Sequence, residues 1–230
     1  MPCYLPGITR TKINVLPGKG DHVVLLDGIA HDGLNMKGFA KALNQQGYQV
    51  LNLGYPSTQL SISEIAEDYL TRHFAKHLPE DGRPVHFITH SMGGIVLRHY
   101  HHTFGMGRLG RVVMLSPPNH GSEVAEHLKH FFVYQWYFGP AGQEIGTGRD
   151  SVPLGLPAAD FEVGVLTGSV SFDPWFDPLF EGTHDGKVSV ESARLEGMKE
   201  FRVVPCSHYG MTFSRKVQAM AMRFLAEGGF

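Results

Sequence analysis

Short apolar runs alternate along this chain with longer segments whose apolar residues recur at helical spacing. The first run, residues 22–27, reads His-Val-Val-Leu-Leu-Asp and is followed at once by Gly28, as expected for a buried strand. Residues 36–47 then place apolar side chains on one helical face and end in glycine. Five more runs follow, at 49–53, 85–89, 111–115, 163–167 and 201–205. This alternation predicts the α/β class, with a mostly parallel central sheet and helices on both faces.

Further segments carry helix signals. Ser61 and Glu64 form a capping-box pattern ahead of an apolar stripe. A helix of about 12 residues is expected after Ser91, and a final helix over 211–227. Residues 12–16 are compatible with either an extra edge strand or an arm on the surface.

The length and composition predict one domain over residues 1–230. The chain has 230 residues, of which 42% are hydrophobic and 18% charged, enough for one well-buried core. One long irregular stretch is expected at 116–162, with aromatic residues crowded between 131 and 138. Loops of this length are often lids or binding insertions, so we interpret 116–162 as a small cap. Its aromatic side chains either pack this cap onto the body or line an apolar acyl pocket.

The charge balance argues against several classes of partner. Twenty basic residues against 22 acidic ones give a formal net charge of −2, which favours neither nucleic acid nor an anionic membrane. A small-molecule partner is therefore expected. The N-terminus has neither the pattern of a secretory leader nor a membrane span, and two cysteines are too few for a disulfide framework. These features favour a cytoplasmic protein without stable membrane insertion.

Ser91 stands where an apolar strand ends and a helix is expected to begin. The sequence around it, Thr-His-Ser-Met-Gly-Gly from residue 89 to 94, has the layout of a nucleophile elbow, in which a sharp turn exposes a serine hydroxyl. Gly93 allows the helix and strand to approach closely. Capping of the helix is the structural alternative for this serine.

A serine hydroxyl needs a base to accept its proton and an acid to orient that base. His208 lies in the loop after the last predicted strand, and Asp185 in the loop after the strand at 163–167. Both loops follow the carboxyl ends of strands, where open α/β sheets carry their working groups. The order Ser91, Asp185, His208 fits a serine hydrolase of this class. Asp173 and Asp177 are rival acids in an apolar loop.

With these motifs in this order, the chain resembles an α/β-hydrolase of the lipase/esterase type. The resemblance runs through Asp-Gly at 27–28, His-Ser-Met-Gly-Gly at 90–94, Ser-Pro-Pro-Asn-His-Gly-Ser at 116–122, Asp-Gly-Lys-Val-Ser at 185–189, and His208. It implies the α/β-hydrolase fold and an acyl-enzyme mechanism carried by Ser91, Asp185 and His208, without metal or organic cofactor. It also implies an oxyanion hole made by the backbone N–H groups of Ile29 and Met92. The expected substrates are carboxylic esters of short to medium acyl chains.

Two positions depart from the family pattern. Thr89 stands where the elbow usually has glycine, and Asp27 where lipases of this type usually have histidine. An ionised carboxylate beside a developing oxyanion would oppose it. We therefore expect Asp27 to turn away and to be held by backbone N–H groups of the loop 28–34.

Trp136, Phe138 and His120 are candidate substrate-binding residues. The histidines at 99, 101 and 102 invite a metal-dependent hydrolase as an alternative, although an H-E-x-x-H spacing is missing, and we expect no metal site. Thioesterase, amidase or acyltransferase chemistry would use the same triad. A protein that keeps the fold and binds a ligand without turnover is the alternative outside enzymes.

Overall fold

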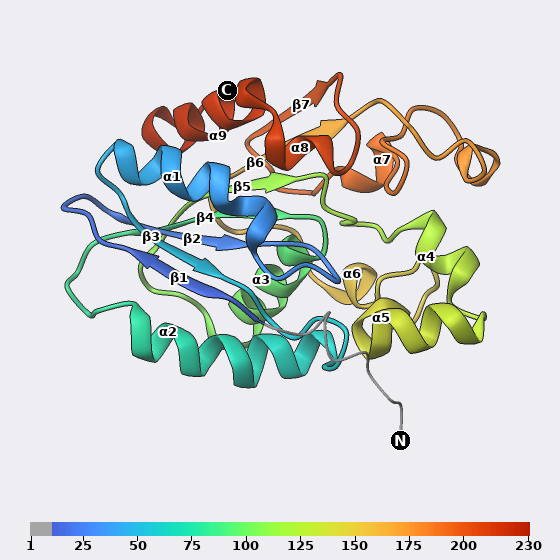
Figure 1. Ribbon diagram of the computed structural model, residues 1–230, viewed down its shortest axis with the longest axis horizontal. Coiled ribbons are helices and arrows are strands. Elements are labelled where there is room, and N and C mark those ends of the chain that lie inside the picture. The colour runs from blue at the N-terminus through green and yellow to red at the C-terminus, as the bar shows by residue number, and fades with distance from the viewer. Residues whose placement is uncertain (1–10) are drawn as a thin grey trace.

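A computed structural model describes residues 11–230 of the protein. In this part of the chain, seven strands form one sheet in the order β1-β3-β2-β4-β5-β6-β7 (Figure 1). Every neighbouring pair is parallel except β1 and β3, which are antiparallel. Residues 12–16 therefore contribute an edge strand rather than a surface arm. The strands are β1 (Ile13–Leu16), β2 (His22–Leu26), β3 (Gln49–Leu53), β4 (Val85–His90), β5 (Leu109–Leu115), β6 (Val163–Gly168) and β7 (Glu200–Val204).

Helices cover both faces of this sheet, which confirms the predicted fold class (Figure 1). The longer ones are α1 (Lys37–Gln45), η2 (Glu64–Leu70, a π-helix), α2 (Thr71–His77), α3 (Met92–Phe104), α4 (Glu123–Leu128), α5 (Phe132–Glu144) and α9 (Arg215–Glu227). Short helical turns are η1 (Leu34–Met36), α6 (Val152–Gly155), η3 (Asp177–Leu179), α7 (Val190–Ala193) and α8 (Gly210–Phe213).

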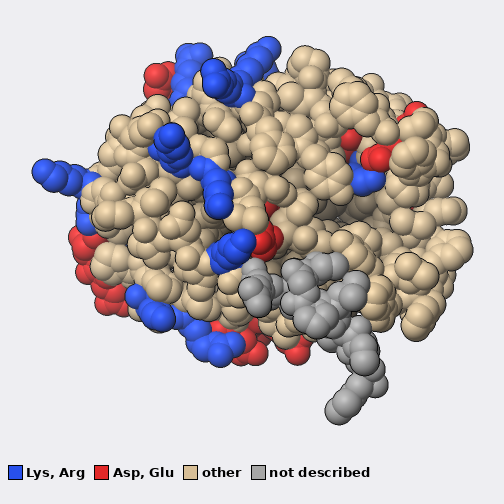
Figure 2. Space-filling view, viewed as in Figure 1, with Lys and Arg blue, Asp and Glu red and all other residues tan. Residues whose placement is uncertain are grey.

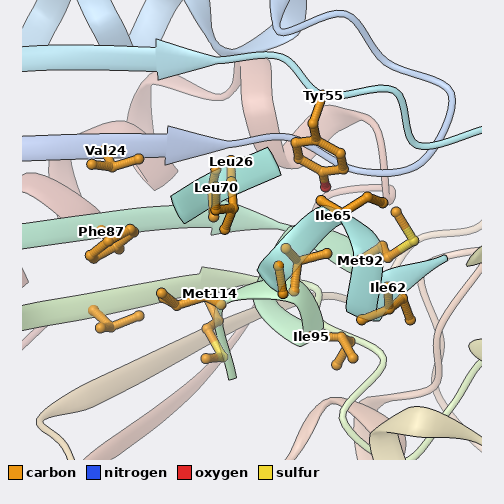
Figure 3. Close-up of a cluster of buried hydrophobic side chains, with 14 of the residues drawn as sticks. Val24, Leu26, Tyr55, Ile62, Ile65, Leu70, Phe87, Met92, Ile95 and Met114 are labelled. Carbon is orange, nitrogen blue, oxygen red and sulfur yellow. The ribbon is translucent and has the colours of Figure 1, made fainter. Parts of the chain in front are cut away.

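The strands divide the buried side chains into two cores by their twofold alternation. In β2, Val24 and Leu26 face the core beneath η2, α2 and α3, whereas Val23 and Leu25 face the core beneath α1 and α9. Figure 3 shows the first of these cores, where Ile65 and the other labelled side chains pack on the sheet. Because both faces are buried, inner strands such as β2 and β6 read as largely apolar runs in the sequence, whereas the edge strands β1 and β7 are partly exposed.

The predicted helix over 211–227 is two helices, α8 and α9. Ser214 between them has an extended backbone (φ −69°, ψ 118°), and its side-chain oxygen accepts a hydrogen bond from the N–H of Val217. Serine commonly caps the start of a helix in this way. The cap at Ser214 therefore separates α8 from α9, although the apolar pattern of the sequence continues across both helices. The capping box at Ser61 and Glu64 forms as predicted, with reciprocal bonds of 2.8 and 3.2 Å.

The expectation of a long irregular stretch at 116–162 is wrong, because this segment contains α4, α5 and α6. The chain is non-helical at Gly139 (φ 61°), where a Cβ would lie 2.0 Å from the backbone oxygen of Thr58. Aromatic residues before this break occupy several sides of α5, and Phe132 is exposed. The single apolar stripe that predicts a helix is therefore missing from the sequence.

None of the helices in residues 11–230 combines the length and the apolar character needed to cross a bilayer.

Candidate functional site

The predicted site residues gather where the parallel strands end. Ser91 follows β4 directly, and the loop beginning at Asp27 follows β2. Asp185 lies in the connection from β6 to β7, and His208 lies between β7 and α8. Parallel strands place their carboxyl ends at one edge of the sheet, so residues far apart in sequence meet there.

Ser91 has a strained backbone. Its φ of 52° and ψ of −127° lie in a region that non-glycine residues seldom occupy, at a cost of about 1–3 kcal/mol. Its N–H donates to the backbone oxygen of Leu115 on β5 over 2.8 Å, and its carbonyl accepts from Gly94 N over 3.0 Å. The neighbouring strand and the first turn of α3 thus hold the serine in the sharp strand-to-helix turn that an elbow requires.

Both glycines behind the serine make room for close packing. A Cβ on Gly93 would lie 2.5 Å from the backbone oxygen of Leu26 and 2.8 Å from that of Asp27. A Cβ on Gly94 would lie 3.3 Å from the Thr89 hydroxyl, which is fully buried. Threonine at position 89 therefore fits this elbow because α3 presents a glycine to it.

Gly93→Ala is expected to destabilise the fold by about 2 kcal/mol or more, because the new methyl group meets backbone atoms that cannot rotate away. Chemical denaturation monitored by circular dichroism measures this change. Gly107→Ala is the matched control, because a Cβ there has no neighbour within 4 Å. Equal stability of the two variants would contradict the close contact between α3 and β2.

Asp185 and His208 form a buried, oriented pair. His208 Nδ1 donates to Asp185 Oδ2 over 2.9 Å, and the second carboxylate oxygen accepts from the N–H groups of Lys187 and Val188 at 3.0 and 2.9 Å. The backbone N–H of His208 also donates to the Asp185 carbonyl over 3.0 Å. Because Nδ1 carries the proton in this arrangement, Nε2 is left as the basic nitrogen.

The carboxyl of Asp185 is held ionised. Burial has the largest influence and would raise its pKa, but the charge of His208 and hydrogen bonds from His208, Ser116 and Val188 together lower the pKa below 3.8.

The rival acids are engaged elsewhere. Asp173 pairs with Lys187 Nζ over 2.6 Å, and Asp177 accepts from Ser171 Oγ over 2.8 Å.

Ser91 and His208 line the same cavity, which has a volume of about 550 Å³. Their exposed fractions are only 8% and 5%. On the side of α4 and α5, the face in Figure 2 is hollowed and mostly uncharged. The lining is largely apolar or aromatic, with contributions from Ile29, Val124, Ala125, Leu128, Tyr134, Tyr137, Phe138, Ile145, Phe176, Val188 and Tyr209.

Phe138 is the one of the three candidate substrate-binding residues that lines this cavity. Trp136 is not among its lining residues, and neither is His120. His120 is exposed, and its ring Nδ1 lies 3.3 Å from the backbone oxygen of Ser192. Tyr134 and Tyr137 were not singled out from the sequence. Their signal is the aromatic run at 131–138, which does not by itself tell which rings turn inward.

The loop after β2 lines this cavity through residues 28–31, and side-chain oxygens accept hydrogen bonds from two of its backbone N–H groups. Gly28 N donates to Asp27 Oδ1 over 2.8 Å, and Ala30 N donates to Ser57 Oγ over 2.9 Å. Ile29 lies between them and lines the cavity. Met92 is the first residue of α3, and N–H groups in a first helical turn have no acceptor within the helix.

Asp27 turns away from the cavity, but its partners differ in part from the expected ones. One backbone N–H, that of Gly28, donates to Oδ1, and the same oxygen lies 3.2 Å from His31 Nδ1 and 3.1 Å from His90 Nδ1. Burial would raise the pKa of Asp27, but hydrogen bonds from the two histidines and their charge, which they carry when protonated, lower this pKa well below its ordinary value. The role of these histidines was missed because the elbow motif that contains His90 assigns it no partner, and His31 stands outside every motif.

The histidines at 99 and 101 do not converge on one point. His99 Nε2 pairs with Glu67 over 2.9 Å, whereas His101 Nε2 pairs with Asp160 over 3.0 Å. Within residues 11–230, the only group of three or more possible ligands that lie close together is Asp27, His31 and His90.

Comparison with known proteins places the chain in a family. No curated protein matches the chain in sequence. Among solved structures, the mature lipase BlEst2 of Bacillus licheniformis is similar, with 16% identity, a TM-score of 0.75, and coverage of 95% of this chain and 98% of the lipase. The phospholipase PlaB of Legionella pneumophila has 18% identity and a TM-score of 0.66, over 91% of this chain and 57% of PlaB. A metagenomic carboxyl esterase has 17% identity and a TM-score of 0.63, over 82% of this chain and 64% of that one. Residues 15–219 match the sequence model of the alpha/beta hydrolase family, and the chain therefore belongs to that family.

Proposed function

We propose that the protein hydrolyses carboxylic esters through an acyl-enzyme on Ser91. The observation that carries this proposal is that Ser91 and His208 line one cavity while Asp185 binds the far nitrogen of His208 over 2.9 Å. A nucleophile, a base and an orienting acid in this arrangement are what acyl transfer requires. Lipase and esterase names among the similar structures agree with this chemistry.

The proposed reaction has two halves. Ser91 Oγ attacks the ester carbonyl carbon as His208 Nε2 takes the hydroxyl proton, and the carbonyl oxygen becomes an oxyanion. The backbone N–H groups of Ile29 and Met92 stabilise that oxyanion, and the bond to the alcohol breaks as His208 returns the proton to it. Water then repeats the sequence on the acyl-enzyme and releases the acid and the free serine.

The cavity favours an apolar acyl group of limited length. A volume of about 550 Å³ is in the middle of the range of ordinary small-molecule sites. Its aromatic walls suit an alkyl chain, and Lys187 is the one Lys or Arg residue among its lining residues.

Hydrolysis of aryl esters is expected to be fastest at or below about eight acyl carbons, because longer chains exceed the cavity. Initial rates on a series of p-nitrophenyl esters from two to sixteen carbons measure this preference. Phe138→Ala enlarges the cavity and is expected to shift the optimum to longer chains. A wild-type optimum at sixteen carbons, with activation at a lipid interface, would contradict the prediction.

Covalent labelling tests the mechanism itself. An organofluorophosphonate is expected to form one covalent adduct per chain in the wild type, detected by mass spectrometry on the peptide that contains Ser91. No adduct is expected in Ser91→Ala. Thioesters, amides and alcohol acceptors assayed in parallel separate the related acyl-transfer activities that use the same triad. No adduct on folded wild-type protein would favour a binding protein without turnover. Activity lost on chelation but kept in Ser91→Ala would favour a metal-dependent hydrolase.

A further inference from the structure

Asp27, His31 and His90 form a largely buried cluster next to the elbow. The register of β2 and β4 pairs Leu26 with Thr89, so the next residues, Asp27 and His90, leave the sheet side by side. The loop after β2 then returns His31 to the same carboxylate. The two imidazole rings lie nearly parallel, 16° apart, and both direct Nδ1 at Asp27 Oδ1.

Hydrogen bonding alone leaves this cluster unsatisfied. His90 Nε2 lies 3.0 Å from the carbonyl oxygen of His208, which only accepts, so Nε2 carries the proton of the neutral ring. Its Nδ1 is then a lone pair that faces a carboxylate oxygen, and two acceptors at 3.1 Å need a cation between them. The other oxygen of the carboxylate, Oδ2, is buried and has no hydrogen-bond partner in the described residues, although Asp27 is only 1% exposed.

The same geometry fits a metal ion. Zinc binds histidine nitrogen and carboxylate oxygen at about 2.0–2.2 Å, so tetrahedral ligand atoms lie roughly 3.3 Å apart. The two histidine nitrogens lie 3.1 and 3.2 Å from the carboxylate oxygen. Histidine ligands of metals also commonly donate their second nitrogen to a backbone carbonyl, as His90 does to His208.

Access to the cluster runs through His31. Its side chain is 20% exposed and lines the cavity, whereas Asp27 is enclosed. An ion can therefore reach the cluster from the cavity. Two neutral imidazoles and one carboxylate leave a divalent ion with one net positive charge.

We propose that Asp27, His31 and His90 bind one divalent cation of the zinc class. The ion takes the place of the protons between the histidine nitrogens and the carboxylate. It fastens the loop after β2, which carries Ile29, to the end of β4. This site goes beyond the proposed function, since the chemistry of Ser91, Asp185 and His208 uses no metal.

Metal titration of the full chain tests the proposal. After dialysis against a chelator, isothermal titration with Zn²⁺ at neutral pH is expected to give one tight site per chain, and Co²⁺ to give visible absorption bands of a site with nitrogen and oxygen ligands. His31→Gln is expected to lower the affinity by more than the 10–100-fold that loss of an outer-shell partner costs. His120→Gln, which removes an exposed histidine outside the cluster, is expected to leave the tight site unchanged.

Metal affinity is measured without ester hydrolysis, so the titration can be repeated in Ser91→Ala. A tight site in that variant would support the metal site even if the proposed esterase activity were absent. Asp27→Asn is the second ligand variant. If it does not fold, His31→Gln still decides the question, because its ring is partly exposed. Absence of a tight site in the wild type, or an unchanged site in His31→Gln, would overturn the proposal. The cluster would then hold a protonated, charged His90 whose Nδ1 donates to the Asp27 carboxylate.

Discussion

Replacement of Ser91 by alanine is expected to lower kcat for aryl ester hydrolysis at least about 10⁴-fold. Removing the nucleophile of a serine triad leaves only binding and oxyanion stabilisation, which supply a small part of the rate. Steady-state kinetics on a p-nitrophenyl ester measure the loss. A variant that keeps more than one percent of the wild-type activity would show that another group performs the attack.

Ser91→Gly is the matched variant that separates chemistry from folding. It lacks the hydroxyl as alanine does, so its activity is expected to be equally low. Its backbone accepts a φ of 52° with less strain, so its free energy of unfolding is expected to exceed that of Ser91→Ala by about 1 kcal/mol. Denaturant titration measures the difference, and a glycine variant less stable than the alanine variant would contradict the strain assigned to the elbow.

Asp185→Asn is expected to lower kcat by about 10⁴-fold with little change in fold. The asparagine amide donates to His208 Nδ1, so the ring proton moves to Nε2 and the nitrogen that faces the cavity no longer accepts the serine proton. The matched control is Asp173→Asn, which breaks the ion pair with Lys187 and is expected to change kcat only a few-fold. A greater loss in Asp173→Asn than in Asp185→Asn would exchange their roles.

The pH dependence of the unfolding free energy gives a second test of Asp185→Asn. The pKa of Asp185 is lower in the folded protein than its ordinary value of 3.8. The ionised carboxyl therefore stabilises the fold above that value, and this contribution is lost as the pH falls through 3.8 toward the folded pKa. The difference in unfolding free energy between the wild type and Asp185→Asn is thus expected to shrink below about pH 5. Denaturant titrations at several pH values measure it.

The sheet and the order of the site residues were predictable because each rests on a local signal. A buried parallel strand is an apolar run, and His208 follows the last run at a loop where such folds carry functional groups. The hydrogen bond between His208 and Asp185 joins two neighbouring strand ends, so chain order was enough to indicate it.

Other features depend on contacts that no local pattern encodes. The break in α5 at Gly139 is tied to the backbone of Thr58, about eighty residues earlier. The partners of Asp27 include His90, which the strand register brings to it from 63 residues away. Which aromatic rings turn into the cavity depends likewise on how α5 packs, so Phe138 and Trp136 looked alike in sequence.

The segment between β5 and β6 bears on how a hydrolase of the proposed kind can change its substrates. It supplies much of the cavity wall, while Ser91, Asp185 and His208 all lie outside it. Its start is fastened by Ser122, whose N–H donates to Ile145 O over 2.8 Å and whose hydroxyl donates to Lys187 O over 2.7 Å. If the proposed mechanism holds, exchange of other residues in this segment is a route to a new substrate range that leaves Ser91, Asp185 and His208 in place, so substrate selectivity and chemistry can evolve separately.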